Sequence, residues 1–296
     1  MSSIIETKGI TKLYGKTRAV DEVSINVNQG DIYGLIGKNG AGKTTLMKLL
    51  LGLAVPKSGT VKLFGGADLS RSRKRIGSLI EAPALYKNQT AFENMKRFSY
   101  FAPATDDEIK SILTFVGLGN TGWKRAGQFS LGMKQRLGIA IALLGRPDVL
   151  ILDEPVNGLD PAGIKEIRDV ILELNSKGVT FLISSHLLDE LGKIATRYGI
   201  MANGRLVEEI SAAQVEEECR GCLKVVTDDS FKAFNTLAAW RRDIKAEVYG
   251  NELQIKSPVE DSSVVASLLV NAGVRVYELK AENVGLENFF IERLGR

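Results

Sequence analysis

The fold is decided by one stretch of the sequence, Gly37-Lys38-Asn39-Gly40-Ala41-Gly42-Lys43-Thr44. It matches the pattern G-x-x-x-x-G-K-[ST] at every fixed position. Glycines let successive backbone amides point into one concavity, which attracts a triphosphate together with the N-terminus of the following helix. In this pattern the lysine reaches the β- and γ-phosphates, and the threonine hydroxyl coordinates Mg²⁺. The predicted nucleotide contacts are Gly37, Asn39, Gly40, Gly42, Lys43, Thr44 and Thr45.

The segments around this loop have the pattern that a phosphate-binding loop requires. Ile32–Ile36 is a short apolar run typical of a buried strand, and the apolar residues after Thr44 are spaced for one face of a helix. Further along, Val149–Leu152 and Val179–Ile183 also have the composition of buried strands, and each precedes a helical pattern. This alternation predicts an α/β fold with a largely parallel sheet covered on both faces.

Two acidic residues end the strand predicted at Val149–Leu152. In a phosphate-loop protein such a strand lies beside the loop, and its terminal Asp153 helps to hold Mg²⁺. Glu154 then lies next to the γ-phosphate and could accept a proton from the attacking water. An exposed acidic turn would have the same sequence, but the phosphate loop favours the catalytic interpretation.

The rest of the chain divides into a helical insert and a second domain. Two capping boxes, Thr90 with Glu93 and Thr105 with Glu108, predict helices within an insert at about 88–145. Residues 1–215 carry 28 basic and 21 acidic side chains, whereas residues 216–296 carry 11 and 14. We place a domain boundary there. The β-α-β-β-α-β order expected beyond it suggests a small α+β, ferredoxin-like domain at 216–296.

Composition excludes several classes of protein. With 44% hydrophobic and 25% charged residues, the 296-residue chain has enough apolar material for a core. Its one histidine, His186, excludes any site that needs two, and two cysteines exclude a disulfide framework. The sequence contains no signal peptide and no apolar run of about 18 residues, so we expect a cytoplasmic protein. A net charge of +4 is too small to indicate nucleic acid, and none is expected as a partner.

A second motif, Phe129-Ser130-Leu131-Gly132-Met133, resembles the Leu-Ser-Gly-Gly-Gln signature of the ATP-binding cassette (ABC) ATPases. Ser130 and Gly132 are the positions that are kept. The resemblance covers residues 4 to about 215 and implies a P-loop ABC cassette, with a mixed-sheet core, a β subdomain and a helical subdomain. It also implies two cassettes paired head to tail, as a homodimer or a heterodimer. Each ATP would then be held by the loop of one subunit and by Ser130 and Gly132 of the other.

Other family elements follow in order along the chain. Tyr14 occupies the position where an aromatic ring stacks on adenine, and Asp160 belongs to Gly158-Leu159-Asp160, which resembles the family's D-loop. His186 follows the strand Val179–Ile183, where the family has a histidine that contacts the γ-phosphate. The resemblance therefore implies that Tyr14 and Asp160 belong to the ATP site and that His186 is catalytic.

One loop departs from the usual family pattern. Family members usually carry a glutamine after the strand that here spans Ile76–Ile80, and this chain has Glu81. Its charge should repel the γ-phosphate unless the metal takes that charge, so we expect Glu81 to ligate Mg²⁺ or to position the water. A tolerated variant without consequence is the alternative. Together with Ser130-Leu-Gly-Met-Lys-Gln135, the segment Glu81-Ala-Pro-Ala-Leu-Tyr86 is similar to exporters for bacitracin resistance and lantibiotic immunity.

The resemblance implies the ATPase subunit of an exporter of peptide antibiotics or related drugs, held at the inner face of the membrane by a separate integral permease. An apolar group beside the Glu81 loop lies where the family receives a coupling helix of that permease: Leu85, Tyr86, Phe92, Met95, Phe98, Tyr100 and Phe101. The alternative is a mechanical ABC ATPase that acts on DNA or ribosomes. The sequence lacks the long heptad insert of DNA-repair members and the second cassette of translation factors. It also lacks the Asn-Lys-x-Asp motif of a GTPase.

Overall fold

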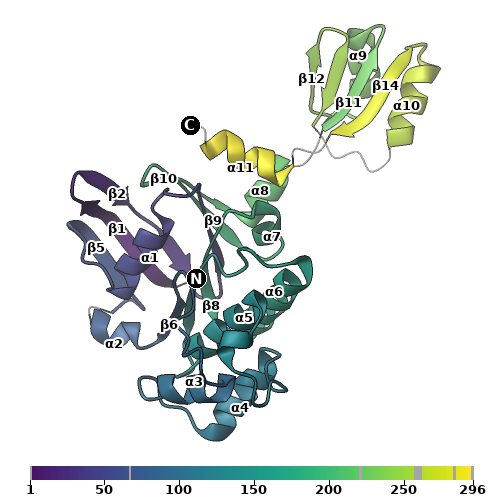
Figure 1. Ribbon diagram of the computed structural model, residues 1–296. Helices are drawn as coiled ribbons and strands as arrows, with labels where there is room; N and C mark the ends of the chain where they lie inside the picture. Colours follow the sequence, from purple (N-terminus) through teal and green to yellow (C-terminus); the bar gives the residue numbers. More distant parts are fainter. Residues whose placement is uncertain (1, 67, 220–221, 257–261, 283–284, 295–296) are drawn as a thin grey trace. The chain divides into compact units, whose positions relative to one another are not determined.

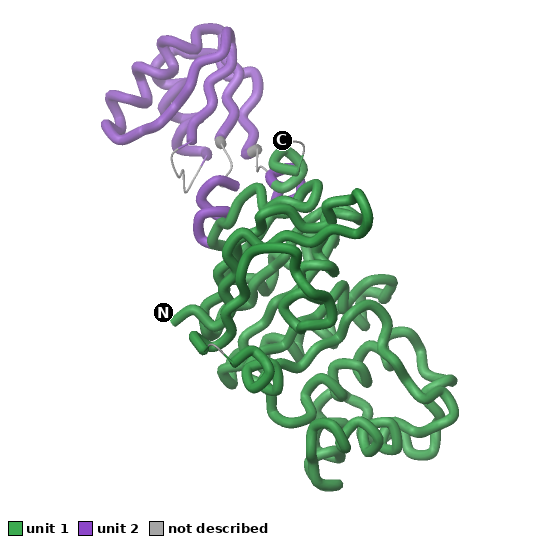
Figure 2. Tube along the Cα trace, turned by 90° about the vertical axis from the view of Figure 1, so that its left-hand side faces the viewer, with its two compact units in different colours: residues 1–212, 290–296 green, residues 213–289 purple. Residues whose placement is uncertain are grey.

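The computed structural model describes residues 2–66, 68–219, 222–256, 262–282 and 285–294. These residues form two compact units, coloured separately in Figure 2. The first unit comprises the chain up to Ala212 and the residues from Phe290 onward, and the second comprises Ala213–Phe289. In the described part of the chain, no helix is long and apolar enough to cross a membrane.

A six-stranded sheet with the strand order β10-β9-β4-β8-β7-β6 forms the centre of the first unit (Figure 1). All its neighbouring strands are parallel except the β9–β10 pair. Every residue of β4, β7 and β8 is buried, as expected for the inner strands of a sheet covered on both faces. The strands are β4 (Ile32–Ile36), β6 (Ile76–Leu79), β7 (Val149–Asp153), β8 (Thr180–Ser185), β9 (Arg197–Ala202) and β10 (Arg205–Ser211).

A second, antiparallel sheet packs on helix α1 (Lys43–Leu51) and on the central sheet. Leu46 and Leu50 of α1 belong to one buried cluster with Ile5 and Val20 from this sheet and Val149 from β7. The helix is therefore covered on both sides, and its position is fixed by two layers. The sheet contains β1 (Ser3–Tyr14), β2 (Thr17–Val23), β3 (Asn26–Asn28) and β5 (Ser58–Leu63), and α2 (Leu69–Arg73) follows it in the chain.

The chain between β6 and β7 is helical. Both predicted capping boxes are present: Thr90 and Thr105 each accept from the N–H of the glutamate three residues later, and that glutamate accepts from the threonine N–H. The elements are α3 (Ala91–Phe98), α4 (Asp106–Phe115), the 3₁₀ turn η1 (Ala126–Gln128) and α5 (Leu131–Ala142). After β7, the first unit continues with α6 (Pro161–Ser176) and α7 (Leu188–Gly192).

The second unit carries an antiparallel sheet of order β12-β13-β11-β14. With two helices between the strands, this is the ferredoxin-like arrangement that the alternating patterns predicted. Its core includes Val225, Leu237, Leu253 and Leu269. The elements are α8 (Ala212–Cys219), β11 (Cys222–Thr227), α9 (Ser230–Trp240), β12 (Ala246–Tyr249), β13 (Glu252–Ile255), α10 (Ser262–Asn271) and β14 (Val276–Glu282).

The last helix, α11 (Leu286–Leu294), ends in the first unit. Phe290 is fully buried and meets the ring of Tyr198 on β9 edge-on, with ring centroids 5.2 Å apart. Arg293 Nε donates to Glu208 Oε2 of β10 at 2.8 Å. The predicted domain 216–296 includes these residues, whereas the structure groups them with residues 1–212. The difference arises because Phe290 packs on Tyr198, which is distant in the sequence. The charge balance that we used to place the boundary carries no information about such packing.

Candidate nucleotide and catalytic site

The predicted phosphate loop connects β4 to α1. Gly40 and Gly42 have φ angles of 83° and 102°, in the left-handed region that favours glycine. A Cβ atom on Gly42 would lie 2.3 Å from the carbonyl oxygen of Ala19, so the backbone passes too close to β2 for any side chain. In the described structure no side chain caps α1, and the N–H groups of its first turn remain available to an anion.

Lys43 bends back over this loop. Its side chain is buried, and Nζ donates to the carbonyl oxygen of Gly37 at 2.5 Å. The same ammonium lies 3.4 Å from Glu154 Oε1. The positive charge of Lys43 therefore lies between the loop and the end of β7. There it can bind a phosphate group that enters the loop.

The hydroxyl of Thr44 and the carboxylate of Asp153 are in direct contact. Thr44 Oγ1 donates to Asp153 Oδ2 at 2.7 Å. Ser184, at the end of β8, donates through its hydroxyl to Asp153 Oδ1 at 2.5 Å and accepts from the N–H of Glu154 at 2.9 Å. Sequence analysis did not identify Ser184, although its register opposite Asp153 in the parallel sheet is what links the two acids to β8.

Glu154 and His186 face each other beside Lys43. His186 Nδ1 lies 2.8 Å from Glu154 Oε2. The other carboxylate oxygen, Oε1, is buried and has no hydrogen-bond partner among the described residues. An acceptor of this kind, directed into the site, can receive the proton of a water molecule.

The donor set next to the loop fits Mg²⁺ bound together with a nucleotide. Thr44 and Asp153 offer the hard oxygen atoms that Mg²⁺ prefers. Within the described ranges, no group of three or more His, Cys, Asp or Glu side chains could hold a metal ion by itself. Because Mg²⁺ usually keeps several waters and takes its remaining ligands from phosphates, two protein oxygens are sufficient.

Glu81 follows β6, the strand next to β7, and its carboxylate bonds to a residue outside this cluster. The parallel register pairs Leu79 with Leu152, which puts Glu81 and Glu154 two residues beyond the same pair. The Glu81 carboxylate nevertheless accepts from Lys48 Nζ of α1 at 2.7 Å. Sequence analysis did not identify Lys48. It lies one turn after Thr44 on the same face of the helix, and this spacing could have identified it from the sequence.

The remaining predicted residues lie on other elements. Tyr14 ends β1 with an exposed ring, and Lys12 Nζ lies over that ring, 5.2 Å from its centroid. Ser130 is the N-cap of α5 and accepts from Met133 N at 3.2 Å, and Asp160 is the N-cap of α6. Both caps are exposed. Gly132 follows in the first turn of α5, a helix N-terminus that can attract an anion.

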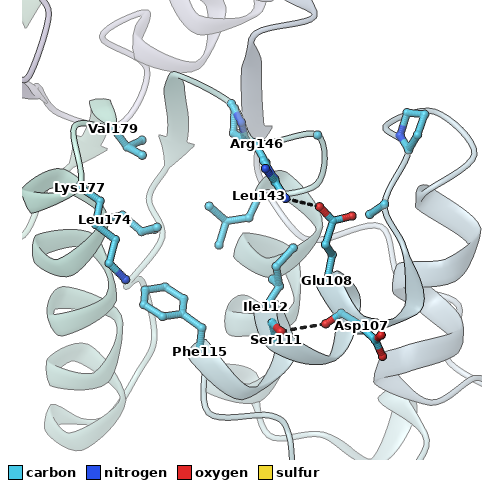
Figure 3. A pocket seen from close by; sticks show the side chains of 14 residues that line it. Asp107, Glu108, Ser111, Ile112, Phe115, Leu143, Arg146, Leu174, Lys177 and Val179 are labelled. Carbon is cyan, nitrogen blue, oxygen red and sulfur yellow. Dashed lines mark hydrogen bonds and ion pairs between the residues drawn. The ribbon is translucent and has the colours of Figure 1, made fainter.

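A cavity of about 790 Å³ lies elsewhere in the first unit, between α4 and the end of α6 (Figure 3). Its apolar lining includes Phe115 and Leu174, Arg146 bonds to Glu108 across its edge, and Lys177 Nζ lies 4.8 Å from the Phe115 ring centroid. These residues precede β7 and β8, whereas the acids of the nucleotide site follow these strands. The cavity is therefore separate from that site.

Together, the fold and the site define an ATP-hydrolysing nucleotide-binding cassette. The ABC transporter family matches residues 20–157. The chain belongs to this family, and it is the ATP-binding, ATP-hydrolysing subunit of an ABC transporter.

Three similar proteins illustrate this membership. The chain is 41% identical over 302 residues to the bacitracin transport ATP-binding protein BcrA of Bacillus licheniformis, covering 100% of this chain and 98% of that protein. It is 45% identical over 207 residues to the lantibiotic transport ATP-binding protein SrtF of Streptococcus pyogenes, covering 70% and 90%. Its fold is similar to that of the cassette MJ0796 in a dimeric post-hydrolysis state bound to ADP and Pi, with a TM-score of 0.63, 23% identity and coverage of 70% and 98%.

Proposed function

We propose that this subunit drives the export of peptide antibiotics of the bacitracin or lantibiotic type through a separate membrane permease. The observation that carries the proposal is the similarity to a bacitracin transport ATP-binding protein along the whole chain. The shorter match to a lantibiotic transport protein supports the same substrate class. A mechanical ATPase acting on DNA or ribosomes has no such support.

In this proposal two cassettes form the active unit. ATP binds to the phosphate loop of one copy, and Ser130 and Gly132 of the second copy complete its site. The N-terminus of α5 supports this, because Ser130 is exposed and the first turn of the helix holds no acidic side chain, so the helix end can attract an anion. The dimeric state of MJ0796, with ADP and Pi, is a precedent in the same fold.

Each side chain of the site has a proposed part in ATP binding or hydrolysis. Lys43 and the loop amides bind the phosphates, and Tyr14 stacks on the adenine. Thr44 and Asp153 hold Mg²⁺, which neutralises phosphate charge when bound. Glu154 accepts the proton of the attacking water at Oε1, which has no hydrogen bond among the described residues and lies 3.4 Å from Lys43 Nζ.

The remaining catalytic assignments concern His186, Glu81 and Asp160. His186 holds the other oxygen of Glu154 and contacts the γ-phosphate. Glu81 ligates the metal or positions the water, as its position beside the end of β7 suggests. Asp160, in the segment after Glu154, meets the second copy.

The permease docks on the aromatic side chains beside the Glu81 loop. Tyr86, Tyr100 and Phe101 are exposed, the last two by 84% and 89%, whereas Met95 of the same group is buried. Exposed large aromatic side chains at this density favour an interaction surface. The subunit would then be peripheral at the inner face of the cell membrane.

The test is complementation in a strain that lacks this gene but keeps the gene of the proposed permease. We expect the wild-type gene to restore resistance to bacitracin or to a lantibiotic, Glu154→Gln to fail, and the protein to co-purify with the permease from membranes. Wild-type expression without any gain in resistance, together with purification on ribosomes or DNA, would refute the export proposal. The variant's protein level serves as the control.

A further inference from the structure

Lys48 and Glu81 form a contact between two segments that sequence patterns treat separately. Lys48 Nζ and Glu81 Oε1 are 2.7 Å apart, one residue on α1 and the other in the loop after β6. Lys48 lies four residues after Thr44, so both side chains project from one face of the helix. Thr44 bonds to Asp153. The pair therefore lies one helical turn from the oxygens that fit Mg²⁺.

The backbone of Glu81 is unusual at this contact. Its φ angle is 60°, a left-handed conformation that is uncommon for a residue with a side chain and requires support from its surroundings. The Lys48 ammonium supplies a directed, charge-assisted hydrogen bond to the carboxylate. The bond thus favours one orientation of Glu81 in a loop that is otherwise open to solvent.

Stability does not explain the pair. The side chains of Lys48 and Glu81 are 33% and 65% exposed, and ion pairs with such exposure contribute little to the free energy of unfolding. Electrostatics of the site explains it better. Without Lys48, the carboxylates of Asp153, Glu154 and Glu81 would together repel an incoming triphosphate. Lys43 would then be the lysine that offsets their charge.

We propose that Lys48 is a positioning residue that holds Glu81 against the phosphate-loop helix and cancels its charge, which allows an acidic side chain to stand beside the γ-phosphate site. A neutral glutamine at that position would not need this lysine. The inference rests on the proposed ATP site and is independent of the transported substrate, so it can fail while the export proposal stands.

A double-mutant cycle tests the proposal. Binding of a non-hydrolysable ATP analogue with Mg²⁺ is measured by calorimetry for Lys48→Met, Glu81→Gln and the double variant. We expect Lys48→Met to weaken affinity about tenfold in the wild-type background, as an unbalanced charge a few ångströms from the phosphates would. In the Glu81→Gln background the same change should cost less than about twofold.

Hydrolysis and matched variants complete the test. Lys48→Arg keeps the charge and should stay within about twofold of wild type, and Lys57→Met removes an equal charge from an exposed lysine and should have no effect. In Lys48→Met the loss should be in KM more than in kcat. Equal losses in both Glu81 backgrounds would mean that Lys48 contacts the nucleotide itself, and this outcome, or no loss at all, overturns the proposal. Melting temperatures identify any variant that has lost its fold.

Discussion

Two acidic residues, Glu154 and Glu81, occupy equivalent places in the sheet but have different surroundings. Both lie two residues beyond a paired position on neighbouring parallel strands, and both have left-handed φ angles, of 49° and 60°. The Glu154 side chain is 20% exposed and lies between Lys43 and His186, whereas that of Glu81 is 65% exposed and lies on Lys48. Position in the fold thus brings an acid to the site, and burial and counter-charge determine its chemistry.

The largest effect should come from Glu154, the less exposed of the two acids. Glu154→Gln removes the proton acceptor but keeps the shape of the side chain, so we expect ATP hydrolysis to fall by about 10² or more. ATP should then stabilise a long-lived dimer, detectable by size-exclusion chromatography. If the variant hydrolyses ATP at the wild-type rate, another residue is the general base. Glu154 and Glu81 would then not differ in the way that we propose.

Glu81, the more exposed acid, should tolerate substitution better than Glu154. Glu81→Gln keeps an oxygen that can serve metal or water, and we expect hydrolysis within about tenfold of wild type, whereas Glu81→Ala should lose more. Steady-state kinetics at several Mg²⁺ concentrations measures both variants. A full-rate Glu81→Ala enzyme would show that the carboxylate has no part in the reaction.

The smallest effect on rate should come from Ser184, which supports the carboxylate of Asp153 and the backbone of Glu154. Ser184→Ala removes the hydroxyl that bonds to Asp153 and to the N–H of Glu154. Because Thr44 still holds Asp153, we expect a loss of about threefold to tenfold in kcat. Because Asp153 keeps Thr44 and the N–H of Glu154 keeps the backbone carbonyl of Ser184 at 3.2 Å, the lost hydroxyl bonds should lower the free energy of unfolding by about 1 kcal/mol. Ser185→Ala, the adjacent change, is the control, and an equal loss there would remove the special role of Ser184.

Sequence predicted the parts of the site that depend on local pattern. The phosphate loop, the acids after β7 and the caps of α3 and α4 follow from short motifs whose geometry is set within a few residues. The pairing of Lys48 with Glu81 depends on how the loop after β6 turns toward α1, and the role of Ser184 depends on sheet register. Neither is encoded in a contiguous pattern, so both required the structure.

The helix α11 has a consequence for how the protein is made. Phe290 is fully buried, with its ring against Tyr198 of β9. Residues 1–212 are therefore synthesised long before their last aromatic neighbour leaves the ribosome, and the second unit is translated in between. A stop codon between residues 213 and 290 would spare every nucleotide-binding motif and still leave β9 without that neighbour. The codons from Phe290 onward thus belong to the same compact unit as the residues that emerge first.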